Sequence, residues 1–156
     1  MLEIEEWLAN ALFFGAKIEV KMFECYDELV QRLPKESLQK QAAAIRAQEA
    51  NHLRISSDAL LRIVSNEFLS KKAVFVGREN ELTELVGSRA ASFMKPLPDD
   101  LGELLDYCYF VETFYESSYS KLVPRIRIPE ISTSLLQMVA ESRAHAKAIK
   151  LIRENL

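Results

Sequence analysis

Apolar residues recur at alternating spacings of four and three along four stretches of this 156-residue chain. That period places them on one face of a helix, and helices with such faces bury them by packing into a bundle. Glycine (4) and proline (5) are scarce, so few turns are encoded and the helices should be long. We therefore predict an all-α fold that forms one domain, residues 1–156. The predicted helices are at about 3–33, 36–67, 100–126 and 130–155.

The connections between these predicted helices differ in length. Pro34 separates the first two helices and the segment IRIPE, 126–130, separates the last two, so each pair should form an antiparallel hairpin. About residues 68–98 join the hairpins, and NELTELVGSRAASFM within them predicts a short helix. Two hairpins joined by a long crossover explain this pattern better than a simple up-down-up-down bundle.

The two predicted hairpins also resemble each other in sequence. Residues 18–29 align with 111–122, and residues 48–53 align more loosely with 141–146. This divergent repeat indicates a duplicated helical hairpin. The aligned pairs are Glu19 with Glu112, Tyr26 with Tyr119, and His52 with His145.

Polar residues interrupt all four apolar faces near the middle of each helix. A buried carboxylate without a partner is strongly destabilising, and the four faces offer no lysine or arginine at this level. A pair of divalent cations would neutralise the cluster, and iron and manganese accept both carboxylate oxygens and imidazole nitrogens. Glu49 and His52, three residues apart, share a helix face and can converge on one ion. The interrupting residues are Glu19, Glu49, His52, Glu112, Ser142 and His145.

With this polar layer the chain resembles the ferritin-like superfamily, in particular the rubrerythrin-like di-iron carboxylate proteins. The resemblance covers all four helices, whereas the long connection is poorly matched. It implies a ferritin-like four-helix bundle in which the first and third helices each supply a terminal glutamate. The second and fourth helices each supply Glu-x-x-His, whose glutamate bridges two metal ions. Carried over by position, it implies as metal ligands Glu19, Glu49, His52, Glu112 and His145.

The fourth helix departs from the family pattern. Ser142 stands three residues before His145, where a glutamate is expected, and Glu141 stands one position earlier, turned by about 100°. Residues four apart also share a helix face, so Glu141 is a candidate sixth ligand, directly or through a local helix bulge. Alternatively one bridge is missing, and the second metal position is weaker than the first.

Two tyrosines follow the glutamates of the first and third helices at a spacing of seven residues. Tyr26 and Tyr119 therefore share a face with Glu19 and Glu112. The simpler interpretation is core filling with satisfied hydroxyl groups. The alternative is that the hydroxyls hydrogen-bond the metal-bound glutamates and orient them.

The cysteines and charges exclude several classes of protein. Cys25 and Cys108 form no CxxC pair, which excludes a rubredoxin-type or zinc-ribbon module, and we interpret them as buried reduced thiols. The net charge of −3 comes without a basic stripe, so no nucleic-acid partner is expected. The apolar run near the start is too short to span a bilayer and follows glutamates rather than basic residues. We therefore expect a cytoplasmic protein that contacts no membrane.

The resemblance implies an oxidoreductase that holds two iron ions, with manganese or a mixed pair as alternatives, and reduces peroxide or dioxygen under oxidative stress. Because the chain lacks a rubredoxin-like module, a separate electron-donor protein is expected. Two alternatives remain: an iron-binding ferroxidase, and a metal-free helical-bundle interaction module. The aromatic residues Phe13, Phe14 and Phe23 cover either the long connection or a second copy, and we expect a homodimer.

Overall fold

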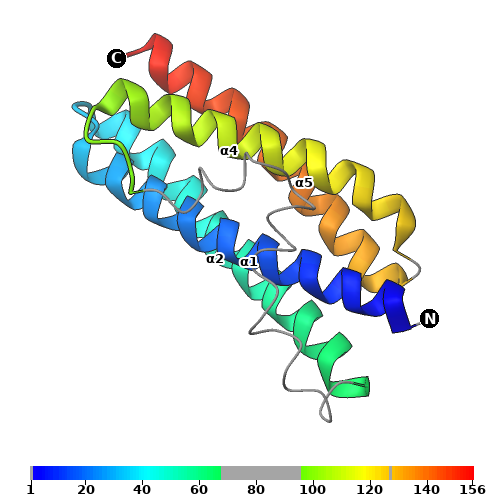
Figure 1. Ribbon diagram of the computed structural model, residues 1–156. Coiled ribbons are helices and arrows are strands. Elements are labelled where there is room, and N and C mark those ends of the chain that lie inside the picture. Colours follow the sequence, from blue (N-terminus) through cyan, green and yellow to red (C-terminus); the bar gives the residue numbers. More distant parts are fainter. Residues whose placement is uncertain (1, 68–95, 127) are drawn as a thin grey trace.

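Four long α-helices form a bundle in the part of the chain that the structure, a computed structural model, describes (Figure 1). The described residues are 2–67, 96–126 and 128–156, with side chains described from residue 11 to residue 59 of the first range. These residues contain no strand, so the all-α prediction is confirmed for them. The short helix predicted inside the long connection lies outside the described residues. The helices are α1 (Leu2–Arg32), α2 (Glu36–Glu67), α4 (Leu101–Leu122) and α5 (Pro129–Glu154).

Local sequence signals account for the described ends of these helices. The Asp100 side chain accepts a hydrogen bond from the Glu103 backbone N–H at 2.9 Å and caps α4. Pro129 occupies the first turn of α5, where its missing N–H has no cost. α4 ends at Leu122 rather than near residue 126, because Pro124 cannot continue the helix. Val123–Arg125 form a 3₁₀ turn instead.

Contacts between chain segments set the directions of the helices. Arg32, at the end of α1, donates to the Pro98 carbonyl at 3.1 Å, just before α4 begins. Arg153, at the end of α5, donates to the Gly102 carbonyl at 3.2 Å, and Lys35 donates to the Asn155 carbonyl. The starts of α2 and α4 therefore lie at the same end of the bundle as the ends of α1 and α5 (Figure 1). α1 runs antiparallel to α2, α4 runs antiparallel to α5, and α2 and α4 run in the same direction.

Apolar side chains from all four helices fill the interior on both sides of the polar layer. One close contact depends on a glycine: a Cβ atom at Gly15 would lie 1.9 Å from the hydroxyl oxygen of Tyr119. That hydroxyl passes over Gly15 and donates to the Ala11 carbonyl at 2.7 Å. Only glycine leaves this space, so α1 and α4 approach closely here. Fully buried apolar residues include Leu12, Met22, Leu29, Leu104, Leu105, Met138 and Ile152.

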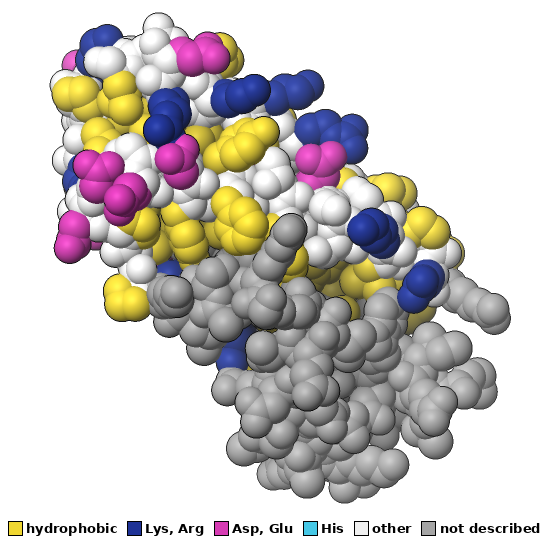
Figure 2. All heavy atoms as spheres, turned by 45° about the horizontal axis from the view of Figure 1, so that its top comes forward, with side chains coloured by type: hydrophobic (Ala, Val, Ile, Leu, Met, Phe, Trp, Pro, Cys, Tyr) yellow, Lys and Arg dark blue, Asp and Glu magenta, His cyan; other side chains and the backbone are white. Residues whose placement is uncertain are grey.

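The surface of the bundle is mixed in character. Both basic and acidic side chains lie among apolar ones on the face shown in Figure 2. None of the described helices is both long enough and apolar enough to cross a membrane. The chemically unusual part of the molecule is therefore its interior.

Candidate metal centre

Five of the six predicted metal ligands meet in the interior at mid-bundle. α1 supplies Glu19, α4 supplies Glu112, and each of the five side chains is at most 2% exposed. Acidic residues are rarely buried so completely without a charged partner. The other three are Glu49, His52 and His145.

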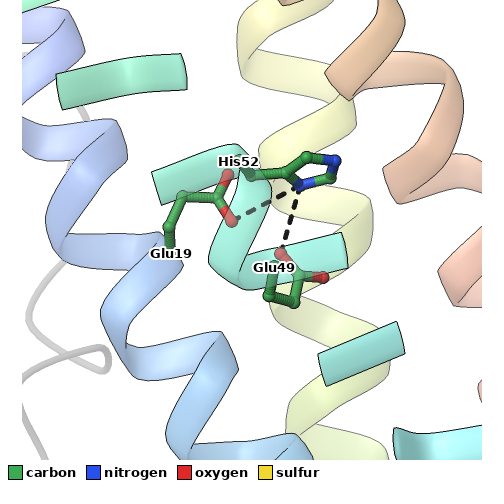
Figure 3. Close-up of side chains that lie close together, drawn as sticks. All are labelled: Glu19, Glu49 and His52. Atoms are coloured by element: carbon green, nitrogen blue, oxygen red, sulfur yellow. Dashed lines mark hydrogen bonds and ion pairs between the residues drawn. The ribbon is translucent and has the colours of Figure 1, made fainter. Parts of the chain in front are cut away.

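Glu19, Glu49 and His52 form the first group of candidate ligands. The Nδ1 atom of His52 lies 3.2 Å from Glu49 Oε2 and 3.6 Å from Glu19 Oε2. Figure 3 shows both carboxylates turned toward this edge of the imidazole. Glu49 and His52 lie one helical turn apart on α2, whereas Glu19 comes from α1. One ligand atom from each of the three residues falls within 4.8 Å of the others.

A second group joins Glu49 to Glu112 and His145. The Nδ1 atom of His145 lies 2.8 Å from Glu49 Oε1 and 3.2 Å from Glu112 Oε1. Ligand atoms of these three residues also lie within 4.8 Å of one another. Glu49 thus belongs to both groups, with one carboxylate oxygen facing each imidazole.

The outer edge of each imidazole contacts a residue of the other hairpin. Nε2 of His52, on α2, is hydrogen-bonded to the Glu141 carboxylate on α5. Nε2 of His145, on α5, is hydrogen-bonded to Oε1 of Gln48 on α2. Histidines that bind metals usually donate their other ring N–H to such an acceptor, which fixes the tautomer. With Nε2 as a donor, each Nδ1 atom faces the carboxylates and would be available to a cation once its own proton is lost.

Glu141 therefore lies outside both ligand groups. The structure places it on the opposite edge of His52, where it is 26% exposed and also accepts a hydrogen bond from Gln137 at 2.9 Å. Its turn of about 100° from the buried face of α5 accounts for this position. The buried face carries Ser142 instead, so α5 contributes one ligand, His145, to the groups found among the described residues.

Gln48 is a site residue that the sequence did not single out. It precedes Glu49 just as Glu141 precedes Ser142, and each of the two stands four residues before a histidine. The internal repeat aligns Gln48 with Glu141 and is the sequence signal for this residue. An uncharged glutamine on a long helix gives no other sign of a role in the site. In the structure Glu141 and Gln48 take equivalent positions, because each is hydrogen-bonded to the Nε2 atom of the histidine on the other hairpin.

The two predicted tyrosines take different partners. The Tyr26 hydroxyl donates to Glu112 Oε1 at 2.8 Å, and its ring lies edge-on to His145 with centroids 6.2 Å apart. Tyr119 instead donates to the Ala11 carbonyl, above Gly15. Tyr115 stacks on Tyr119 with centroids 4.3 Å apart. Tyr26 alone of the predicted pair hydrogen-bonds a site carboxylate.

Burial and mutual contact change the acidity of these groups. Burial raises the pKa of Glu19 to about 8, with a contact to His52 opposing it. Burial alone would lower the pKa of His52, but hydrogen bonds with Glu19 and Glu49 outweigh it and raise the pKa to about 11. The same balance, with Glu112 and Glu49 as partners, raises the pKa of His145 to about 9. Without a metal at neutral pH, Glu19 holds its own proton, and protons on both imidazoles offset the charge of the other two carboxylates.

The residues fit a pair of divalent cations. Glu19 Oε1 and Glu49 Oε1 are buried and accept no hydrogen bond among the described residues, although Glu49 Oε1 lies near His145. A buried carboxylate oxygen without a donor is destabilised relative to water, and a cation would stabilise it. Carboxylate oxygens and imidazole nitrogens together are ligands suited to iron or manganese.

Comparison with protein-family models, with curated proteins and with solved structures gave no match. The ferritin-like resemblance therefore stays a prediction from the sequence. The chemistry assigned to the site rests on the two ligand groups and the carboxylate that they share.

Proposed function

We propose that this chain is a ferritin-like protein that binds two iron or manganese ions and reduces peroxide or dioxygen with electrons from a separate donor. The observation that carries the proposal is the position of Glu49, whose two carboxylate oxygens each face the Nδ1 atom of a different imidazole. A carboxylate placed in this way suits a bridge between two cations. The common direction of α2 and α4 supports a long crossover between the hairpins, as in ferritin-like bundles.

The ligand groups assign the residues to two positions. Glu19, Glu49 and His52 would hold one ion, and Glu49, Glu112 and His145 the other. Glu141 and Gln48 would hold the imidazoles from outside. Because Ser142 supplies no carboxylate, fewer protein ligands would hold the two ions on that side, and a small oxidant would take the remaining coordination position.

The chain's own residues would prepare the centre for a two-electron reduction. When bound, two reduced ions supply two electrons to peroxide or dioxygen. The Tyr26 hydroxyl holds Glu112 in place through a hydrogen bond of 2.8 Å. Glu141 holds one proton of His52 on Nε2, so loss of the other proton would make Nδ1 available to an ion. Burial of every ligand to 2% exposure or less excludes bulk water from the reacting atoms.

Metal stoichiometry tests this proposal directly. The protein is loaded with ferrous ions without oxygen, separated from free iron, and its iron content is measured before one portion receives peroxide and another receives air. We expect two ions per chain and a new near-ultraviolet absorption on oxidation. Retention of neither iron, manganese nor zinc would refute the proposal. Continued oxidation of excess ferrous ions, well beyond two per chain, would indicate a ferroxidase for which iron is the substrate.

One observation favours a second candidate, the metal-free interaction module. Every imidazole nitrogen of the two histidines already has a carboxylate or amide partner within the described residues. Such a network can satisfy a buried polar layer without a cation. The same metal analysis separates the candidates, because a metal-free module would purify without ions and gain no thermal stability from ferrous or manganous salts.

A further inference from the structure

Two thiols lie together in the interior beside the candidate centre. Cys25 on α1 and Cys108 on α4 are fully buried, at 0% exposure, and are the two cysteines of the chain. Cys25 is near enough to raise the pKa of the Cys108 thiol. Neither takes part in the function proposed above.

The register of the two helices places these cysteines at one level. Along the antiparallel α1 and α4, Arg32 meets Pro98 and Ala11 meets Tyr119, and Cys25 and Cys108 lie between these contacts. When helix axes lie roughly 8–10 Å apart and each Cα lies about 2.3 Å from its axis, facing Cα atoms are about 3.4–5.4 Å apart. The upper part of this range overlaps the roughly 4.4–6.8 Å that separates the Cα atoms of a disulfide.

The thiol pair also adjoins the second ligand group. Cys108 lies one turn before Glu112, about 6 Å along the axis of α4. Cys25 directly precedes Tyr26, whose hydroxyl donates to Glu112. Cys108 is therefore within about one helical turn of Glu112, and Cys25 adjoins the tyrosine that hydrogen-bonds the same carboxylate.

We propose that Cys25 and Cys108 form a reversible dithiol–disulfide couple that stores the two electrons needed to reduce one molecule of hydrogen peroxide. This inference rests on the proposed function and identifies a source of electrons within the chain. In the overall reaction two S–H bonds break and an Sγ–Sγ bond forms, while the O–O bond of peroxide breaks. The two electrons and two protons released by the thiols convert peroxide into two molecules of water. A small dithiol, acting as the external donor, then reduces the disulfide.

The low acidity of the Cys108 thiol makes it possible to measure whether thiol oxidation depends on the metal centre. The hydrogen bond with Cys25, followed by burial, raises the pKa of the Cys108 thiol well above its usual value. A buried thiol that holds its proton reacts slowly with peroxide, since the thiolate is the nucleophile. Rapid oxidation of both thiols would therefore require metal ions in the centre.

Thiol counting by mass spectrometry tests the proposal. Iron-loaded and metal-free samples of the reduced protein are treated with hydrogen peroxide, quenched in acid, and alkylated with N-ethylmaleimide under denaturing conditions. In the iron-loaded sample we expect both alkylation sites to be lost, with a monomer lighter by two hydrogen atoms that dithiothreitol restores. In the metal-free sample both sites should remain over the same time. Two free thiols in the iron-loaded sample, or equally fast loss in the metal-free sample, would overturn the proposal.

Single variants and the iron content complete the test. Cys25→Ala and Cys108→Ala replace one buried thiol by a smaller apolar side chain, and circular dichroism checks that each variant folds. Each should bind iron normally, lack the intramolecular disulfide and keep its remaining thiol. Oxidation of that thiol at the wild-type rate would overturn the proposal that the two cysteines act as a couple. Iron content reports the proposed function separately: normal binding with unreacted thiols refutes this inference alone, whereas absent binding refutes the metal centre itself.

Discussion

The imidazole rings of His52 and His145 stack across the interior, with centroids 5.7 Å apart and ring planes inclined by 25°. They belong to different hairpins, and each turns its Nδ1 atom toward Glu49. Two rings and one shared carboxylate therefore form a single unit rather than two independent polar contacts. A change at any of the three should alter both candidate metal positions.

Replacing His52 by alanine should abolish tight metal binding at the first position. Metal binding is coupled to the folded state, so the variant should also lose the stabilisation that metal gives the wild type. At a metal concentration of about 100 Kd that stabilisation is about 2.7 kcal/mol. Thermal unfolding with and without manganous salt measures it. The control is Ser56→Ala, a buried serine four residues later on α2, which should bind metal normally. A His52→Ala protein with full metal content would refute the ligand assignment.

Glu49→Gln should reduce the metal content from two ions per chain to one or none. The amide keeps the size of the side chain but removes the negative charge that both positions share. Metal analysis after gel filtration gives the ratio. Glu103→Gln, an exposed change on α4, serves as the control for the loss of one charge. If the Glu49 variant retains two ions, this carboxylate does not bridge.

Ser142→Glu should strengthen the second metal position. The new carboxylate would stand on the buried face of α5, three residues before His145, and complete the Glu-x-x-His pattern. The affinity of the variant for the second ion should rise. The metal-free variant should lose stability, because it buries another carboxylate without a partner. Metal titration and chemical unfolding measure the two effects. Ser142→Gln adds the same bulk without charge and should not raise the affinity, and equal affinities in both variants would contradict the expectation.

Metal binding should release protons and strengthen as the pH rises. The folded-state pKa values of His52 and His145, about 11 and about 9, exceed the ordinary value of 6.5. Protonation of these groups therefore stabilises the metal-free fold fully below about pH 6.5, and this stabilisation is lost as the pH rises through about 9 and then 11. A cation must displace the same protons. The thermal shift caused by manganous salt should accordingly be larger near pH 8 than near pH 6.

Calorimetry in buffers of different ionisation enthalpy measures the proton release directly. The observed binding enthalpy should vary with the buffer, since the buffer takes up the protons that leave the site. A binding enthalpy that is the same in all buffers, together with a pH-independent thermal shift, would contradict the protonation scheme.

Tyr26→Phe should lower the free energy of unfolding without preventing metal binding. The change removes the hydrogen bond to Glu112, and hydrogen bonds to charged groups contribute about 1.5–3 kcal/mol. Urea unfolding of the metal-free protein measures the loss. Tyr109→Phe, at a position 38% exposed, is the matched control and should change stability little. Equal stability of the two variants would show that the Tyr26 hydroxyl does not support the site.

The spacing of apolar residues predicted the helical fold because a helix repeats its buried face at a fixed period. The same period located Glu19, Glu49, His52, Glu112 and His145, since polar residues on a buried face stand out against apolar neighbours. The predicted end of α4, near residue 126, lies beyond the observed end at Leu122. The prediction placed the helix boundary at the IRIPE segment and did not allow for Pro124, which ends α4 earlier.

The sequence alone did not determine the outer contacts of the imidazoles. Glu141 lies about 100° from the buried face, where its flexible side chain can turn inward or outward, and only packing against α2 directs it to His52. Tyr119 illustrates another limit. Its spacing from Glu112 matches that of Tyr26 from Glu19, but the absent side chain of Gly15 on the neighbouring helix lets its hydroxyl reach a backbone carbonyl. Such differences depend on neighbours far apart in sequence.

The crossed pairs, His52 with Glu141 and His145 with Gln48, also restrict how the two hairpins can slide along each other. Purely apolar faces tolerate alternative alignments, because a shift of one turn buries similar side chains again. Here a shift of one helical turn, about 5.4 Å, would separate both pairs at once and leave two buried imidazoles without these hydrogen-bond partners. The polar interior thus selects one alignment of the halves, and the folded chain holds its candidate ligands together without a cation.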